Sequence, residues 1–222
     1  MKSIIKVILI IMPWAIRRII LNKLFDYAIH PTAKIGFAWV FPRKLIMHEH
    51  SKIDHFTVVI HLDKVEVGAK STIGRSNWIT GFPTGTNSKH FQHQVGRKSE
   101  LFIGKSSAIT KHHHIDCTNS ITIGEFVTIA GYQSQLLTHS IDVYENQQSS
   151  KPILIEDYAF IGTNVIIVGG ATLPAHSVLG AKSLLNKSFQ EEWKIYAGVP
   201  AKMIADIPKS AKYFSRKDGF VY

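Results

Sequence analysis

The sequence predicts an all-β fold, a parallel β-helix, and three observations carry this prediction. Aliphatic residues recur at every sixth position through most of the 222-residue chain. The fifth position of many of these hexads is small, and the second is often glycine. Six is neither the period of a helix nor that of a plain strand, so each hexad indicates a short strand followed by a corner. Three such sides close one coil, which gives roughly seven coils in total.

The aliphatic series runs in several stretches, separated by shifts in the repeat. Its members are Ile29, Ile35, Phe41, Met47, Ile53, Val59 and Val65; Val67, Ile73 and Ile79; Ile103, Ile109, Ile115 and Ile121; Ile123 and Ile129; and Ile155, Ile161, Ile167, Leu173, Leu179 and Leu185. The small fifth-position residues include Thr57, Ser71, Ala159, Ala171, Ser177 and Ser183. Stacked coils would bury both sets in one continuous column.

Residues 29–187 are therefore predicted to form the β-helix domain, with two interruptions. The first excursion, 80–100, is rich in turn residues and contains no hexad, and the second, 138–151, is shorter. Long irregular loops in compact domains are usually functional. Residues 188–222 are predicted to form a short C-terminal cap and a basic tail, because an open coil end would expose apolar surface and unpaired strand edges.

Residues 1–28 are predicted to form an apolar and basic N-terminal helical segment. The longest uncharged run, Val7 to Ile16, is shorter than the roughly 20 residues that a membrane-spanning helix needs. No cleavage pattern of a secretory signal follows it. Two interpretations stay open for residues 4–25: an interfacial helix that contacts a membrane peripherally, or a helix that packs on this protein or on another subunit.

Charge and cysteine content narrow the classes of partner. Twenty-six Lys and Arg against sixteen Asp and Glu give a net charge of +10 with histidine neutral, which favours anionic partners. The basic residues are scattered, so nucleic-acid binding is not expected. A single cysteine, Cys117, excludes an intrachain disulfide framework and fits a reducing compartment. We therefore expect a cytoplasmic protein, at the inner face of the cytoplasmic membrane if residues 4–25 bind lipid.

The last coils resemble those of the hexapeptide-repeat acyltransferases, and the resemblance covers about residues 29–207. It is carried by KPILIEDYAFIGTNVIIVGGATLPAHSVLGAKSLLNKSF and by the closing motif IYAGVPAKMI. The residues that fall where that family's pattern expects them are Gly162, Gly170, Gly180, Ala181, Gly198 and Pro200. Within the family, the chain looks most like the O-acetyltransferases of surface polysaccharide and sugar metabolism. The resemblance implies left-handed coils, a homotrimer with active sites at subunit interfaces, acetyl-CoA as donor, a carbohydrate hydroxyl as acceptor, and no metal requirement.

The position of the family's catalytic histidine corresponds to His139, in LLTHSID, where the repeat breaks. A sugar hydroxyl attacks a thioester only as a base removes its proton, and a neutral imidazole suits that role near pH 7. Asp142 is a candidate to orient the imidazole or to contact the acceptor, or it is a solvated loop residue. No serine or cysteine lies in a nucleophile motif, so direct transfer is expected.

The resemblance also implies a donor site of small and basic residues. Its candidate members are Gly162, Thr163, Ala181, Lys182, Asn186, Lys187 and Lys202. Asn186 stands where the family often has threonine. The basic members would lie near the CoA phosphates.

A run of three histidines follows Lys111 on the coil before His139. Strand alternation directs His112 and His114 outward and His113 inward, so His112, His114 and the following Asp116 are candidate acceptor contacts. Three adjacent histidines on one strand cannot all ligate one ion. For the protein as a whole, two functions other than acetyl transfer stay open. One is a zinc-dependent lyase of the carbonic anhydrase type, and the other is a non-catalytic, membrane-docked β-helical scaffold.

Overall fold

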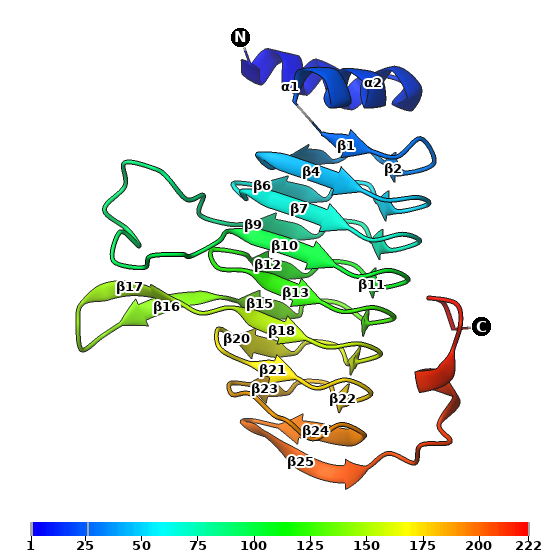
Figure 1. The fold of residues 1–222 in the computed structure, drawn as a ribbon, viewed down its shortest axis with the longest axis vertical. Coiled ribbons are helices and arrows are strands. Elements are labelled where there is room, and N and C mark those ends of the chain that lie inside the picture. The colour runs from blue at the N-terminus through cyan, green and yellow to red at the C-terminus, as the bar shows by residue number, and fades with distance from the viewer. Residues whose placement is uncertain (1, 26, 222) are drawn as a thin grey trace.

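The protein is a column of stacked coils with three flat sides (Figure 1). The computed structural model describes residues 2–25 and 27–221. In Figure 1 the strands of the front sheet point to the right, and the chain returns leftward behind them as it descends, which is a left-handed winding. The prediction of a left-handed parallel β-helix is confirmed.

Each turn of the chain passes through three parallel sheets in the order A, B, C. Sheet A contains β1 (Ala28–Ile29), β4 (Lys44–Met47), β7 (Lys64–Val67), β10 (Glu100–Ile103), β13 (Ile121–Ile123), β18 (Ile153–Ile155) and β21 (Thr172–Leu173). Sheet B contains β2 (Lys34–Ile35), β5 (Lys52–Ile53), β8 (Thr72–Ile73), β11 (Ala108–Ile109), β14 (Thr128–Ile129), β19 (Phe160–Ile161) and β22 (Val178–Leu179), with the closing strands β24 (Lys194–Gly198) and β25 (Ala201–Asp206). Sheet C contains β3 (Trp39–Phe41), β6 (Val58–Ile60), β9 (Trp78–Thr80), β12 (His114–Asp116), β15 (Gln135–Leu137), β20 (Ile166–Val168) and β23 (Leu184–Leu185).

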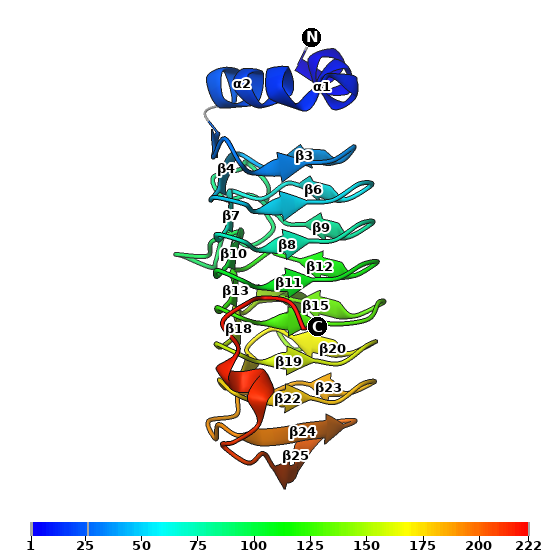
Figure 2. The ribbon, with the colours of Figure 1, turned by 90° about the vertical axis from the view of Figure 1, so that its right-hand side faces the viewer.

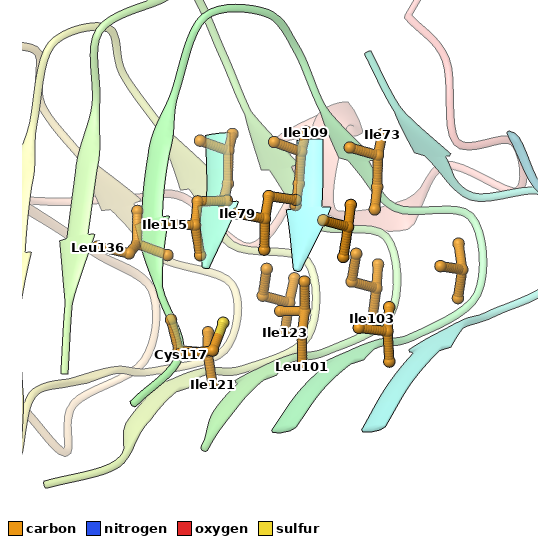
Figure 3. Packing of buried hydrophobic residues seen from close by; sticks show 14 of the residues in the cluster. Ile73, Ile79, Leu101, Ile103, Ile109, Ile115, Cys117, Ile121, Ile123 and Leu136 are labelled. Carbon is orange, nitrogen blue, oxygen red and sulfur yellow. The ribbon is translucent and has the colours of Figure 1, made fainter. Parts of the chain in front are cut away.

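The hexad residues form the interior of the column. Ile103 aligns with Ile123 in sheet A, and Ile109 aligns with Ile129 in sheet B. All four side chains are buried, and Figure 3 shows such residues stacked from coil to coil. The small polar residues inside are also satisfied: the Ser71 hydroxyl donates to the Gly104 carbonyl of the next coil at 2.6 Å. The repeat therefore buries an aliphatic column, and among the described residues no buried serine or threonine hydroxyl lacks a partner.

The hexad count is off by one residue at two corners. Val40, not Phe41, aligns with Val59 in sheet C. Leu136 lies seven residues after Ile129, because the corner contains an extra residue beside Gly131, whose φ is +73°. Glycine adopts this left-handed conformation without a steric penalty.

Two helices cover the N-terminal end of the column, where a single helical segment was predicted (Figure 2). They are α1 (Lys2–Ile11) and α2 (Trp14–Leu24), and Pro13 separates them. Proline lacks the amide hydrogen that a continuous helix needs, so the chain turns there. Leu9 and Leu21 are buried against the first coil. No helix in the described part of the chain has both the length and the apolar character needed to cross a bilayer.

The other end is closed by strands. β24 and β25 pair antiparallel, which covers the last coil of sheet B. A short 3₁₀ turn, Lys212–Ser215, follows, and the tail runs back along the column (Figure 2). The Tyr213 ring packs edge-on against Phe160, so this tail is fixed to the outer face of sheet B.

Candidate active site

Both excursions leave the column at one corner, where sheet C passes to sheet A (Figure 1). The first is the loop of residues 81–99, between β9 and β10. The second is a hairpin of two antiparallel strands, β16 (His139–Asp142) and β17 (Gln147–Ser150). The Gln94 amide donates to the Ser150 carbonyl at 3.1 Å, and the Ser150 hydroxyl donates to the Gln94 side-chain oxygen at 2.5 Å. The loop and the hairpin are therefore joined, although 56 residues separate these partners.

His139 lies at the start of the hairpin and is paired with Asp116 of the coil above. The His139 Nδ1 and the Asp116 Oδ2 are 2.6 Å apart, and Asp116 is only 6% exposed. The Thr118 hydroxyl donates to the other carboxylate oxygen at 2.7 Å. An ionised carboxylate can only accept, so Nδ1 carries the proton and Nε2 keeps a free lone pair. The imidazole is thus held in the tautomer that a general base requires.

The pair also sets the charge state of both groups. Burial opposes ionisation of Asp116, but the hydrogen bonds from His139 and Thr118 outweigh it and lower the pKa of the carboxyl. The hydrogen bond to Asp116 raises the pKa of His139 above 6.5, against the opposing effect of partial burial. The basic form of His139 is therefore reached at a higher pH than for a free imidazole.

Residues of the first excursion form one wall beside the imidazole. The Phe91 ring meets the His139 ring edge-on, with centroids 6.1 Å apart. The Arg97 guanidinium lies over the Phe91 ring, 4.8 Å from its centroid, and donates to the carbonyls of Phe82 and Thr118. Arg97 thereby ties the loop to the coil that carries Asp116.

Cavities open on both sides of the hairpin. One, of about 350 Å³, is lined by Thr138, His139, Ser140, Asp142, Lys151 and Gly169, among others. A second, of about 340 Å³, lies between the hairpin and the loop and is lined by Lys89, His90, His93, Asn146, Gln147 and Gln148, among others. Two larger cavities, of about 580 and 610 Å³, lie against sheet A and do not include His139. Of these cavities, the one of about 350 Å³ contains His139, so it is the candidate site for a substrate.

The predicted acceptor residues do not form one group. His114 is exposed on the outer face of β12, whereas His112 lies at the corner before that strand, where sheet B passes to sheet C. Asp116 is buried and engaged by His139, so it does not offer a free carboxylate to a sugar. His113 points inward, as predicted, and burial lowers its pKa to about 4. It is a neutral core histidine.

The interpretation that Asp142 orients the imidazole is wrong. Its Oδ1 accepts the backbone amides of Tyr144 and Glu145 at 3.0 and 3.2 Å and so closes the hairpin turn. Asp142 is three residues beyond His139 on an extended strand, about 10 Å along the chain. The structure gives the contact with the imidazole to Asp116 instead.

Four of the predicted donor residues lie together at the corner from sheet B to sheet C. Gly162 and Thr163 follow β19, and Ala181 and Lys182 follow β22 one coil later. A side chain on Gly162 would meet the Ala181 nitrogen at 2.6 Å, so these coils stack closely.

The other three predicted donor residues lie elsewhere. Asn186 and Lys187 follow β23, at the corner from sheet C to sheet A. Lys202 lies on β25 opposite Ala197, which packs against Gly180.

The donor corner and His139 are separated by the width of sheet C. The Gly169 amide donates to the Leu137 carbonyl, which places Gly169 beside the His139 corner. Thr163 precedes Gly169 by six residues, and the chain between them turns at Asn164 (φ +55°) and then runs along β20, so the two lie at most about 20 Å apart across sheet C. Within one chain, these two halves of the predicted site do not meet.

Metal ligation is not supported by the arrangement of donor side chains. Across residues 2–25 and 27–221, no three His, Cys, Asp or Glu side chains converge on a point that could hold an ion. Burial raises the pKa of the Cys117 thiol, so this residue is also a poor ligand and a poor nucleophile.

Comparison with known proteins connects this geometry to a family. The chain matches no protein-family model. It is 31% identical over 124 residues to the galactoside O-acetyltransferase of Escherichia coli (strain K12), a match that covers 54% of this chain and 61% of that relative. A hexapeptide-repeat containing acetyltransferase from Vibrio cholerae has 28% identity and a TM-score of 0.53, covering 64% of this chain and 74% of that one. The proteins that this chain resembles are therefore acetyltransferases, and the chain spans less than two thirds of the length of the galactoside O-acetyltransferase.

Two further structures extend the comparison of this hexapeptide-repeat protein. The Vibrio cholerae protein was also solved in complex with acetyl-CoA, and there the identity is 27% and the TM-score 0.53, over 64% of this chain and 71% of that one. A polysialic acid O-acetyltransferase is 16% identical with a TM-score of 0.55, and the match covers 84% of this chain and 90% of that one. The second likeness shows the shared fold alone.

Sequence reasoning missed three residues of the site in this hexapeptide-repeat protein: Asp116 as the partner of His139, Phe91 and Arg97. A signal existed for the first. Asp116 aligns with Leu137 in sheet C, one coil above the residues that lead to His139. Correct coil-to-coil register would have placed the carboxylate there. Phe91 and Arg97 belong to an excursion without a repeat and gave no such signal.

Proposed function

We propose that this protein is an O-acetyltransferase that moves an acetyl group from acetyl-CoA to a sugar hydroxyl, with His139 as general base. The observation that carries the proposal is the imidazole at the break in the repeat, whose Nδ1 is held by Asp116 and whose Nε2 is free. The similarity to a galactoside O-acetyltransferase and to an acetyltransferase solved with acetyl-CoA supports the choice of reaction.

The residues suit a direct transfer. The acceptor hydroxyl gives its proton to the His139 Nε2 as its oxygen attacks the thioester carbonyl, and Asp116 stabilises the imidazolium that forms. The carbon–sulfur bond then breaks, the acetyl ester is released, and the proton passes from Nε2 to the departing thiolate. The buried Cys117 offers no thiolate for an acyl-enzyme.

Two copies of the chain are needed to complete the proposed site. We place the donor at the corner of Gly162, Thr163, Ala181 and Lys182, with Asn186, Lys187 and Lys202 as further candidate contacts. That corner lies across the width of sheet C from His139 of the same chain, so the donor held by one copy would face the base of its neighbour. A homotrimer with one site at each subunit interface satisfies this requirement.

The acceptor would enter the cavity of about 350 Å³ beside His139. Its lining includes the hydroxyl-bearing Ser140 and Ser149 and the carboxylate-bearing Asp142, side chains that suit the hydroxyls of a carbohydrate. Exposed His114 would extend the acceptor contacts along sheet C. A precursor of a surface polysaccharide, modified on the cytoplasmic side, is the acceptor that we favour.

The proposal is tested by thiol release from acetyl-CoA with a panel of free sugars and lipid-linked oligosaccharides. We expect acceptor-dependent release of CoA, and an acetyl ester on the sugar by mass spectrometry. The His139→Ala variant, which lacks the proposed base, is the negative control. Thiol release with no acetylated sugar in any reaction, or equal release by the variant, would reject the assignment.

A further inference from the structure

The N-terminal end of the column presents a surface that acetyl transfer does not use. Helices α1 and α2 lie flat across this end, far from the closing strands β24 and β25 (Figures 1 and 2). One side of each helix faces the first coil, and the other faces away from the column. The two sides differ sharply in their contacts.

The inner side is fixed by specific contacts. The buried Arg17 guanidinium donates to the carbonyls of Gly36 and Ala38 at 2.8 and 3.0 Å. The Trp14 indole donates to the Ala33 carbonyl at 3.0 Å. These bonds hold α2 on the first coil, so its inner side is fixed and its outer side is turned away from the column.

The outer side of this helix pair is aliphatic. On α1 it carries Ile5, Val7, Ile8 and Ile11, all exposed, and on α2 it carries the exposed Ile16 and Ile19. At 100° per residue, the four α1 residues lie within about 160° of one another, and the buried Leu9 lies outside this arc. Isolated exposed aliphatic residues are ordinary, but a contiguous group on one face marks an interaction surface.

Charge indicates which partner this surface fits. Residues 1–25 contain five basic residues, Lys2, Lys6, Arg17, Arg18 and Lys23, and no Asp or Glu. Arg17 is buried on the inner side and Lys6 lies over the Phe41 ring, so neither adds to the charge of the outer side. Lys23 is exposed on the same side of α2 as Ile16 and Ile19. Two copies of such a surface would bring like charges together, which opposes self-association through it. Anionic lipid headgroups would complement the charges, while the acyl region takes the isoleucines.

We propose that the outer side of α1 and α2 docks the protein end-on on a bilayer containing anionic lipids. The aliphatic side chains enter the boundary between headgroups and acyl chains, and Lys23 pairs with lipid phosphate. The helices lie in the plane of the interface and do not cross the bilayer. This inference is independent of the proposed catalysis.

The experiment is flotation of the full chain with vesicles of phosphatidylcholine alone, or with about a third phosphatidylglycerol. We expect binding to the anionic vesicles that weakens in high salt, and little binding to the neutral ones. Ile8→Glu combined with Ile19→Glu should reduce the partition coefficient roughly tenfold or more. The matched control is Ile204→Glu on β25, at the opposite end of the column, since Ile204 is also an exposed isoleucine (61%, against 46% and 49% for Ile8 and Ile19).

Other outcomes decide against the proposal. No flotation with anionic vesicles, equal flotation with neutral ones, or equal loss in the Ile204→Glu control would overturn it. Light scattering without lipid tests the second-copy alternative: a mass that falls when Ile8 and Ile19 are replaced would show that the surface binds another copy. Circular dichroism checks that the double variant is folded. His139→Ala should float like the wild type, so a failure of the catalytic assignment leaves this test intact.

Discussion

The two corners on either side of sheet C have the same origin in the repeat but have diverged in structure. At the corner from sheet B to sheet C, small residues keep the coils in close contact, and a side chain on Gly162 would strike the next coil. At the corner from sheet C to sheet A, the chain leaves the repeat twice and forms the loop 81–99 and the hairpin that begins at His139. One corner keeps the coils closely stacked, and the other forms a polar cavity beside His139.

The difference shows how a solenoid acquires a site without losing its core. The interior column continues past both corners, and Ile115 still aligns with Leu136 on the coils that carry Asp116 and His139. The excursions are therefore free to carry function, because the stacked aliphatic residues supply the stability. The corner with the two excursions supplies the base, and we assign the donor to the corner from sheet B to sheet C.

Removing the base should produce the largest effect. His139→Ala is expected to reduce turnover roughly 10²- to 10⁴-fold, because no other group accepts the hydroxyl proton. His139 is at the column's edge, so circular dichroism and oligomeric state should match the wild type. A variant that keeps wild-type turnover would show that the corner with the two excursions is not the catalytic one.

Asp116→Asn should have the next largest effect, roughly 10²-fold on turnover, because the amide no longer stabilises the imidazolium or fixes its tautomer. In the wild type, kcat/KM should fall as the pH drops through the pKa of His139, because the protonated imidazole is inactive. Asp116 raises this pKa, so the fall should begin at a higher pH than for a free imidazole. In Asp116→Asn the pKa of His139 falls, so the loss of kcat/KM should begin at a lower pH.

The pH profile distinguishes positioning from mere structural support. A loss of turnover with an unshifted pH profile would mean that Asp116 only supports the coil.

Asp142→Asn should have the smallest effect, less than roughly threefold on turnover, since its carboxylate closes the hairpin turn and does not contact the imidazole. An amide oxygen can still accept the Tyr144 amide. Turnover and its pH profile in the same assay provide the check. A loss as large as that of Asp116→Asn would return the orienting role to Asp142.

The fold could be predicted because its signal is local. The six-residue period recurs in most coils, and Ile109, Ile129 and Ile161 occupy the same inward position in successive strands of sheet B. The break in the repeat at His139 was visible for the same reason. The separation of α1 from α2 also had a local cause, Pro13, which the prediction of a single segment did not use.

The site could be predicted only in part, because its contacts depend on register and on irregular packing. The link between Asp116 and His139 depends on which residue of one coil lies over which residue of the next, and the extra residue near Gly131 shifts that count. The wall made by Phe91 and Arg97 depends on how a loop without a repeat folds back. The repeat reveals the first contact only when its register is counted correctly, and no periodic pattern encodes the second.

The most direct test of the central claim, that the base and the donor corner come from different copies, is complementation. His139→Ala lacks the base, and Ala181→Trp would place a large ring at the exposed donor corner. Each variant alone should be inactive. Refolded together in equal amounts, they should regain about a quarter of wild-type activity, because each mixed trimer has one interface with both halves intact. No recovery from mixed trimers of confirmed composition would contradict the account.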